Sequence, residues 1–534
     1  MSTHAVEPVE ELRPAELPRG EPETATDKLV QKTHWWALST GMHVVLALLI
    51  GFFWAVGSRE DAEAVVVRPP RKPRQLPEME KPRNLDPQKK ILDMPKTVED
   101  PVFKKDALEA DHNETADEEE FQKAKGDSVD FVSDKPFKGK GTYDVIGGGP
   151  GGGGRYGTRV GGKQNLVARG GGGGDTEDAV LAALKWLSRH QGGDGAWKTA
   201  GYIGECRKIA KYAGGGTCSP NPGHDDFDAG NTGLSLLAFL GAGYSHLSKD
   251  TYDGICFGDV VRKGLQWLMN HQDPEGCIGG RTTHKYMYNH TIAALAMSEA
   301  YGLTGSNLFK EQAQKAVDFT IAAQNPGKGW RYSYKCGDND SSVSGWAVMV
   351  LKSAEISGLP FPRSGYDGTR SWYDDVTEEA YPRVGYTFRG SGPVILPGQN
   401  EHFSHHEALT AIGVMARIFM DKNKGDPRVS GGCDLLLRDK PQWSGNGIDF
   451  YYWYYASLAL FQYDGPSGAK WKSWNEDMKN ALVKNQNTGS SGCKNGSWEP
   501  VDRWSCEGGR IYGTAINTLT LEVYYRYANV FNPK

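Results

Sequence analysis

A short pattern recurs four times in the last two-thirds of the chain and restricts the fold more than any other feature. In each copy an aromatic–apolar pair lies late in a helix-like segment, and a Gln, a Gly turn and usually a Trp follow. The copies are Trp186-Leu187, Gln191, Gly195 and Trp197; Lys263-Gly264, Trp267-Leu268, Gln272 and Gly276; Phe319, Gln324, Gly329 and Trp330; and Gln486, Gly496 and Trp498. We expect each Gln to bind the free carbonyls at the end of its own helix, and each Trp to pack over that end and the next helix. The pattern therefore predicts helical units that pack side by side.

Helical periodicity dominates the sequence after residue 174, because apolar residues recur at three- and four-residue spacing. No segment has the pattern of a convincing strand. Some segments carry charges along one face, whereas others are small and apolar all round, as fully buried helices are. The alternation of these two classes predicts an inner ring of helices inside an outer ring. The expected helices are AVLAALKWLSRHQ, NTGLSLLAFLGAG, VVRKGLQWLMNHQ, TIAALAMSEAYG, AVDFTIAAQ, SGWAVMVLKSAEISG, EALTAIGVMARIFM, DFYYWYYASLALFQ and TAINTLTLEVYYRYA.

The repeats resemble the QW repeats of squalene-hopene and oxidosqualene cyclases and the helix pairs of protein prenyltransferase β subunits. The region is also similar to the prenyltransferase/squalene-oxidase-repeat proteins of planctomycete-type bacteria. Its resemblance to them rests on TEDAVLAALKWLSRHQ, GNTGLSLLAFLGAGYSH, AVDFTIAAQNPGKGWRYSY, SVSGWAVMVLKSAEISGL, DFYYWYYASLALFQ and GGRIYGTAINTLTLEVYYRYANVF. It covers roughly residues 147–534 and implies an all-α, α/α-toroid with a central cavity. It assigns no catalysis, since much of that bacterial group has no assigned activity.

The N-terminal third has a different composition. Residues 1–34 are acidic and contain prolines, so we expect a disordered tail. Residues 35–57 are predicted to be a transmembrane anchor, because the stretch from Trp35 to Val56 has no Asp, Glu, Lys or Arg and about 20 such residues span a bilayer. Residues 58–174 are charged and then Gly-rich, and we expect a disordered linker. The toroid is expected over residues 175–534.

Charge and cysteine content bear on partners and location. The formal net charge is -5 with no basic patch, which argues against a nucleic-acid partner. All 8 cysteines follow residue 200, and an even number confined to one domain favours disulfides in an oxidising compartment. Candidate pairs are Cys206 with Cys218 and Cys493 with Cys506, and scattered buried thiols are the alternative. We therefore expect a single-pass membrane protein whose large domain lies outside the cytoplasm.

The sharpest catalytic candidate precedes the expected inner helix SGWAVMV. Hopene-type cyclases carry a D-x-D-D-T motif whose middle Asp protonates an alkene, and Asp340 and Asp338 match its middle and first positions. Ser341 replaces the third Asp. Such an acid must stay protonated in an apolar pocket. Helix capping is the alternative role for these acids.

Other residues at the expected starts of inner helices are candidates for lining the central cavity, because parallel inner helices would bring their N-termini to one mouth of the ring. Rings in this set offer faces to apolar chains and cations, although core packing explains them equally well. The candidates are Asp228, Tyr288, His290, Trp346, Tyr451, Tyr452 and Tyr512.

Metal and cofactor chemistry is not expected. The stretch Asp449-Phe450-Tyr451-Tyr452 resembles part of the prenyltransferase zinc site, but Tyr452 stands where that family has a zinc-binding His. His402, His405 and His406 are weak metal candidates, with a solvated loop as the alternative.

Three functions remain open from the sequence. The first is an anchored toroid that binds an apolar, isoprenoid-like ligand or a partner protein in its cavity. The second is a terpenoid cyclase or isomerase that protonates an alkene from Asp340. The third is a polysaccharide-active α/α-barrel that uses paired carboxylates such as Asp226 and Asp340.

Overall fold

The computed structural model describes residues 43–45, 48, 154–159, 163–206, 218–219, 223–390, 393–396, 399–402 and 407–531. The chain divides into two units, Met1–Pro95 and Lys96–Lys534, and nearly all described residues belong to the second. The predicted anchor lies outside the described residues apart from His43, Val44, Val45 and Leu48. Within the described part of the chain, no helix has the length and apolar character needed to cross a membrane.

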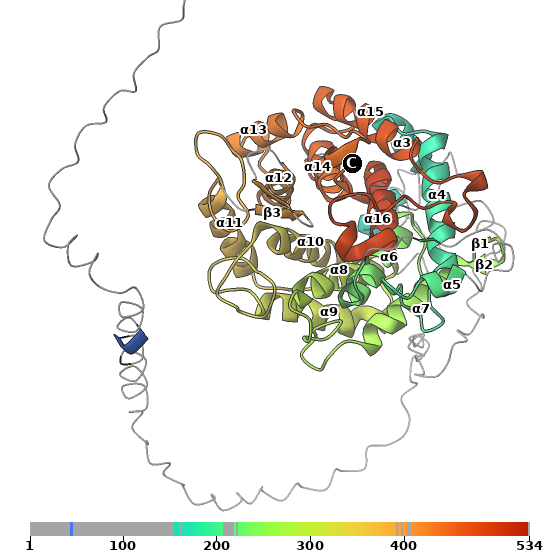
Figure 1. Ribbon diagram of the computed structural model, residues 1–534, viewed down its shortest axis with the longest axis horizontal. Helices are drawn as coiled ribbons and strands as arrows, with labels where there is room; N and C mark the ends of the chain where they lie inside the picture. The colour runs from blue at the N-terminus through green and yellow to red at the C-terminus, as the bar shows by residue number, and fades with distance from the viewer. Residues whose placement is uncertain are drawn as a thin grey trace, which may run out of the picture. The chain divides into compact units, whose positions relative to one another are not determined.

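Two concentric rings of helices make up most of the described part of the second unit (Figure 1). Each inner helix packs against the next, and the last packs against the first, so the ring closes. The inner helices are α6 (Asp228–Gly241), α8 (Tyr286–Thr304), α10 (Ser341–Ser357), α12 (Ala408–Asp421), α14 (Phe450–Asp464) and α16 (Ser505–Leu521). The outer helices are α4 (Gly174–Arg189), α7 (Phe257–Asn270), α9 (Asn307–Ala322), α11 (Ser364–Val376), α13 (Pro427–Leu436) and α15 (Ala469–Val483). The expected α/α-toroid is therefore confirmed.

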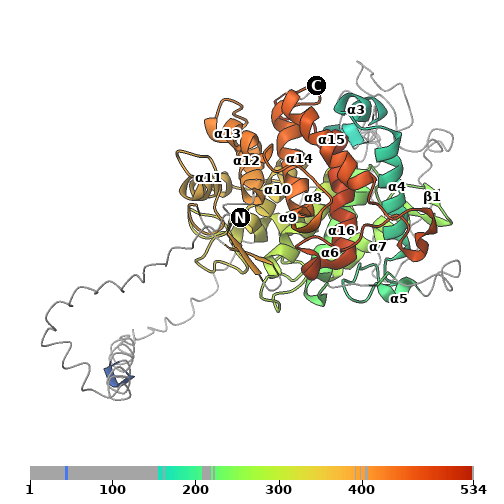
Figure 2. The same cartoon turned by 45° about the horizontal axis from the view of Figure 1, so that its top comes forward.

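Burial explains why the two rings differ in sequence. Nearly every residue of α6, α10, α12 and α16 is buried, whereas α7 and α15 bury one face only. A helix covered on all sides needs small and apolar residues all round, and a half-covered helix needs them on one stripe. A tilted view shows the axes of α4, α14 and α16 roughly aligned through the ring (Figure 2).

Three outer helices and two hairpins were not among the expected elements. The missed helices are α11, α13 and α15. Short antiparallel pairs join β1 (Thr251–Tyr252) to β2 (Ile255–Cys256) and β3 (Pro393–Leu396) to β4 (Gln399–His402). The expectation of no strands was thus wrong, although the strands are short and belong to the loops that connect α6 to α7 and α11 to α12. The remaining short elements are α5 (Ile203–Cys206), α17 (Val523–Arg526) and the 3₁₀ turns η4 (Asp225–Phe227), η6 (Gly445–Gly447) and η7 (Gly489–Lys494).

In the repeat, the Trp and not the Gln binds the carbonyls at the end of its own helix, which differs from the expectation. The Trp197, Trp330 and Trp498 indoles donate to carbonyls near the end of their own outer helix, at 2.6–2.8 Å. Each Gln amide instead donates to its own Gly turn and to a carbonyl of the next outer helix. These bridges are Gln191 to Val260, Gln272 to Gln312, Gln324 to Gly365 and Gln486 to Ala179. The Gln therefore links neighbouring repeats, and Gln486 links the last repeat to the first outer helix.

The end of the predicted linker is folded, which corrects the boundary at residue 175. The turn η2 (Gly154–Arg159) and helix α3 (Lys163–Gly170) pack on the ring, and Tyr156 and Val167 are buried. The Tyr156 hydroxyl hydrogen-bonds Ser353 near the end of α10 at 2.7 Å. Arg159 donates to Leu240 near the end of α6 and to Glu299 late in α8. This segment thus covers the C-terminal ends of α6, α8 and α10, and the Tyr156 and Arg159 side chains hold it there.

Candidate functional site

The N-termini of the inner helices lie together at the opposite end of the ring, as we expected for a toroid with parallel inner helices. Tyr288, early in α8, donates to Ser342 in the first turn of α10 at 2.8 Å, and Ser342 hydrogen-bonds the Tyr451 hydroxyl at the start of α14 at 2.7 Å. Lys285 before α8 forms an ion pair with Glu507 at the start of α16 at 2.9 Å. We call this end of the inner ring the N-terminal mouth.

Half-buried aromatic side chains border the N-terminal mouth. They are Tyr288, Tyr332, Tyr386, Tyr451, Trp504 and Tyr512. Their polar atoms are bound to protein partners. Tyr332 and Tyr386 hydrogen-bond each other, Tyr512 donates to Asp502 at 3.4 Å, and the Trp504 indole donates to Asp449 at 3.2 Å. The hydroxyl and indole groups of these rings are therefore engaged within the protein.

Asp340 lies under this mouth as both a cap and a buried acid. Its Oδ1 accepts the Val343 N–H at 2.7 Å at the start of α10, so the capping role is confirmed. The side chain is fully buried, and its Oδ2 has no hydrogen-bond partner. Burial raises the pKa of Asp340 to about 7, while Arg331, at 4.0 Å, opposes the rise. The carboxyl of Asp340 therefore titrates near neutral pH.

Asp338 has a different environment from Asp340. Its side chain is 76% exposed and lies 3.6 Å from Arg331. Asp338 therefore does not share the buried environment of Asp340. Asp226 is also exposed, so the pair of carboxylates expected for polysaccharide chemistry does not share one environment.

A second buried acid was missed by the sequence analysis. Asp502 accepts hydrogen bonds from the Ser505 hydroxyl and the Phe450 N–H, and burial raises its pKa to about 7. The nearby charge of Asp449 adds to this rise. Its position three residues before Ser505, at a helix start, was the available signal, but many capping acids share that signal.

The remaining predicted cavity residues separate into two groups. Asp228 is half-buried and accepts the Thr199 N–H at 2.7 Å at the start of α6, and burial raises its pKa. Trp346 is buried and stacks on Tyr454 within the inner ring. Tyr452 points away from the mouth, because its hydroxyl donates to Leu436 of α13 at 2.9 Å.

His290 lies between the two rings and not at the mouth. Its Nδ1 accepts the Ile278 N–H at 3.2 Å, and its Nε2 hydrogen-bonds Thr320 of α9 at 2.9 Å. Burial lowers its pKa to about 3, so it is a neutral packing residue. Of the weak metal candidates, His405 and His406 lie outside the described residues, and the side chain of His402 is not described.

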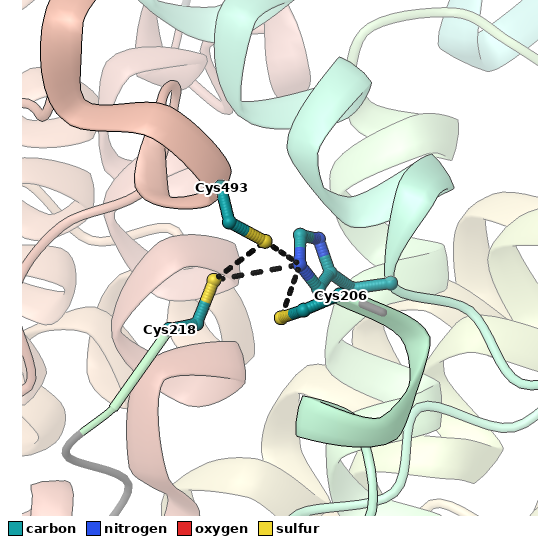
Figure 3. Close-up of side chains that lie close together, drawn as sticks. Cys206, Cys218 and Cys493 are labelled. Carbon is teal, nitrogen blue, oxygen red and sulfur yellow. Dashed lines mark hydrogen bonds between the residues drawn. The ribbon is translucent and has the colours of Figure 1, made fainter. Parts of the chain in front are cut away.

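A separate cluster joins one histidine and three cysteines behind the first outer helix. The His190 Nε2 atom lies 3.3 Å from the Cys206 Sγ, 3.4 Å from the Cys218 Sγ and 3.2 Å from the Cys493 Sγ. The ligand atoms of all four residues lie within 4.8 Å of one another, and all four are buried. Figure 3 shows the three cysteine side chains converging. The hydrogen bond with Cys218 contributes most to lowering the pKa of Cys206.

This cluster overturns the predicted disulfides. All eight cysteines are free, so neither predicted pair, Cys206 with Cys218 or Cys493 with Cys506, is bonded. Cys506 instead donates to the Arg503 carbonyl. The argument that disulfides place the large domain outside the cytoplasm therefore no longer holds. Sequence spacing did not reveal the cluster, because 303 residues separate His190 from Cys493.

Comparison with solved structures finds similar chains at low identity. A GH76 α-mannanase from Bacteroides thetaiotaomicron is 12% identical with a TM-score of 0.45, covering 68% of this chain and 98% of its own. The type II terpene cyclase MstE from Scytonema, with geranylgeranyl dihydroxybenzoate as substrate, is 13% identical with a TM-score of 0.40, covering 68% and 99%. An α-1,6-mannanase from Salegentibacter sp. HEL1_6 is 11% identical with a TM-score of 0.43, covering 66% and 99%.

These similarities are too low to transfer a substrate or a mechanism to this chain. No family model matches the chain, and no curated protein matches it. Function must therefore be argued from the site itself.

Proposed function

We propose that the protein binds an apolar, isoprenoid-like ligand at the N-terminal mouth of its inner ring. The single observation that carries this proposal is the border of half-buried aromatic rings whose polar atoms are already bound to protein partners. A ligand that needed many hydrogen bonds would have to break those contacts, whereas an apolar chain needs only the ring faces. The opposite end of the ring is covered by η2 and α17.

A second candidate function is proton transfer from Asp340 to an alkene of such a ligand. A buried carboxyl with a pKa raised to about 7, whose Oδ2 makes no hydrogen bond and lies beside half-buried aromatic rings, favours it. In that step the carboxyl O–H bond breaks, a C–H bond forms, and Asp340 is left as a carboxylate. The resulting carbocation is stabilised by ring faces and ends by losing a proton, so the reaction is an isomerisation or a cyclisation.

Binding is tested on the full chain in detergent with squalene and geranylgeraniol as probes. Retention of the probe is measured by mass spectrometry for wild type, Tyr451→Ala and a control, Tyr301→Ala. Tyr301 is a half-buried tyrosine in the last two turns of α8, far along the helix from the mouth. We expect retention by wild type and Tyr301→Ala and a loss of about tenfold in Tyr451→Ala, since one buried aromatic ring contributes over 1 kcal/mol. Equal retention by all three proteins contradicts the proposed ligand site.

Proton transfer is tested on the same samples by searching for products of unchanged mass but altered retention time. Asp340→Asn keeps the helix cap and removes the acid, because Asn caps about as well as Asp. A product present with wild type and absent with Asp340→Asn supports the second function. Ligand that is retained but never converted by wild type leaves binding alone.

A further inference from the structure

We propose that His190, Cys206, Cys218 and Cys493 bind one zinc ion, and that this ion joins the first and last repeats of the ring. The ligand set of one imidazole and three thiols is one that structural zinc sites use. Each of the four side chains is at least 97% buried. The cluster is separate from the N-terminal mouth and takes no part in the proposed ligand binding.

The spacing of the ligand atoms corresponds to one tetrahedral ion. With Zn–S of about 2.3 Å and Zn–N of about 2.0 Å, the edges of a tetrahedral site measure about 3.5–3.8 Å. The His190 Nε2 atom lies 3.2–3.4 Å from the three sulfurs, and the Cys218 and Cys493 sulfurs are 3.3 Å apart, so slight expansion admits the ion. Four protein ligands in a buried site leave no position for water or substrate, which is the arrangement of a structural zinc.

His190 is oriented as a metal ligand. Its Nδ1 lies 2.7 Å from the Trp186 carbonyl, and a carbonyl accepts only, so this nitrogen carries the proton. The Nε2 lone pair then points at the three sulfurs. Zinc-bound histidines commonly donate their second ring N–H to a carbonyl in this way.

The second repeat provides an internal comparison. His271 occupies the same place in its repeat: its Nδ1 lies 2.8 Å from the Trp267 carbonyl, and its ring stacks on Trp267 as His190 stacks on Trp186. His271 is nevertheless exposed, and it is not part of any metal-binding group in the described chain. The histidine orientation therefore belongs to the repeat, and the three cysteines are what the first repeat adds.

The position of the cluster explains what the ion would do. His190 follows α4, the first outer helix, whereas Cys493 lies in η7, between α15 and α16. In Figure 1, α4 lies beside α15 and α16 although the chain's two ends contribute them. We call the contact of α4 with α15 and α16, where the ring closes, the seam. The Trp186 indole donates to the Cys493 carbonyl at 3.0 Å, so the cluster lies at the seam. An ion with ligands on both sides would hold the seam closed.

The backbone of Cys218 is also held in place by hydrogen bonds from neighbouring side chains. Its carbonyl accepts hydrogen bonds from the Tyr202 hydroxyl and the Arg510 Nε, both at 3.1 Å. Arg510 is fully buried in α16 and forms an ion pair with Glu499. Both partners fix the backbone of Cys218 without occupying its sulfur, which leaves the thiol free to ligate.

The experiment measures metal in the full chain, purified in detergent under reducing conditions with zinc in the medium. Elemental analysis should find about one zinc per chain in wild type, and X-ray absorption at the zinc edge should give three sulfur ligands and one nitrogen. Cys493→Ser and His190→Ala should lose most of the zinc and melt at lower temperature. His271→Ala and Cys433→Ser are matched controls, since Cys433 is a buried free thiol outside the cluster, and both should keep the metal.

Several outcomes overturn the proposal. One is wild-type protein that stays free of zinc after incubation with zinc and reductant. Another is zinc that persists in both His190→Ala and Cys493→Ser. An intact mass lower by about 2 Da, with no metal, would show a disulfide instead. If the variants do not fold, the wild-type absorption spectrum still decides, because fewer than three sulfur ligands contradicts the site.

Discussion

Asp340 combines two demands that usually oppose each other. As the cap of α10 it accepts a backbone N–H, which favours the carboxylate, yet full burial favours the neutral acid. Burial has the larger effect and raises the pKa of Asp340 from its ordinary value near 4 to about 7. The neutral form therefore persists to a pH at which ordinary carboxyls are ionised.

The raised pKa predicts how stability depends on pH. A carboxyl with a raised folded-state pKa stabilises the fold below its unfolded pKa, and this contribution is lost as pH rises towards 7. We expect Asp340→Asn, which cannot ionise, to gain stability relative to wild type by roughly 3 kcal/mol between pH 5 and pH 8. Urea unfolding of both proteins at the two pH values measures this gain. A constant difference between them would show that Asp340 is ionised throughout.

Sequence alone predicted some site residues and not others. Asp340, Tyr288, Tyr451 and Tyr512 were predicted because ring topology brings helix starts together. His290 and Tyr452 were placed at the mouth by position, but the helix turns them towards the outer ring. The metal cluster was missed because its ligands come together only through ring closure, which no local spacing records.

At the scale of the helix, a Gln and a Gly together tie α4 to α7, α7 to α9 and α15 to α4. Gly195, Gly276 and Gly496 have φ values of +97°, +102° and +97°, and each approaches a backbone carbonyl of the next outer helix. Only a residue without a side chain fits that approach. The repeat pattern was therefore predictable as a packing unit, although the partner of its Gln was not.

Gly496→Ala should weaken the seam between α15 and α4. An added Cβ would lie 2.1 Å from the Ala182 carbonyl oxygen in a backbone region that side chains disfavour. We expect a loss of about 2–4 kcal/mol in stability from strain and the clash, measured by urea unfolding. Gly327→Ala is the control, because Gly327 has φ +66° but open space around it, so it isolates the backbone cost. Equal losses in both variants would mean that the close approach contributes nothing.

Helices α11, α13 and α15 were missed for a physical reason. Each is an outer helix with one buried face, and α11 carries glycines and charges that weaken a helical pattern. Packing against the inner ring stabilises such helices more than their own propensity does. The inner helices, being apolar all round, were easier to predict.

For the whole molecule, the two ends of the inner ring have different chemistry. At the C-terminal end, Glu299 lies fully buried between Arg159, at 2.7 Å, and Arg526, at 3.3 Å. These residues come from η2, α8 and α17, so one ion cluster ties the start and the finish of the described unit to its centre. At the N-terminal mouth the ion pairs are Lys285 with Glu507 and Arg503 with Asp449, and each joins the starts of two inner helices.

Glu299→Gln should destabilise the ring strongly. It leaves two buried guanidinium groups without their carboxylate, and removing one partner of a buried ion pair costs about 3–5 kcal/mol. Thermal and urea unfolding measure the loss. Glu311→Gln removes an exposed pair with Lys315 on α9 and should change little. Similar unfolding of the two variants would contradict a structural role for the buried cluster.

A chain that begins at residue 175 tests the role of the folded linker end. It lacks Tyr156 and Arg159, which cover the C-terminal ends of α6, α8 and α10. We expect it to melt well below a chain that begins at residue 150, when both are compared in the same detergent. Equal melting temperatures would show that the ring is complete without η2 and α3.

Ring closure also has a consequence for how the protein is made. A ribosome releases α4 early and η7 late, and 303 residues separate His190 from Cys493. The seam can therefore form only after η7 has left the ribosome, whatever the earlier repeats have already done. A nascent or truncated chain would present an open arc with an unpaired edge at each end, and quality-control factors could recognise that edge as the mark of an incomplete product.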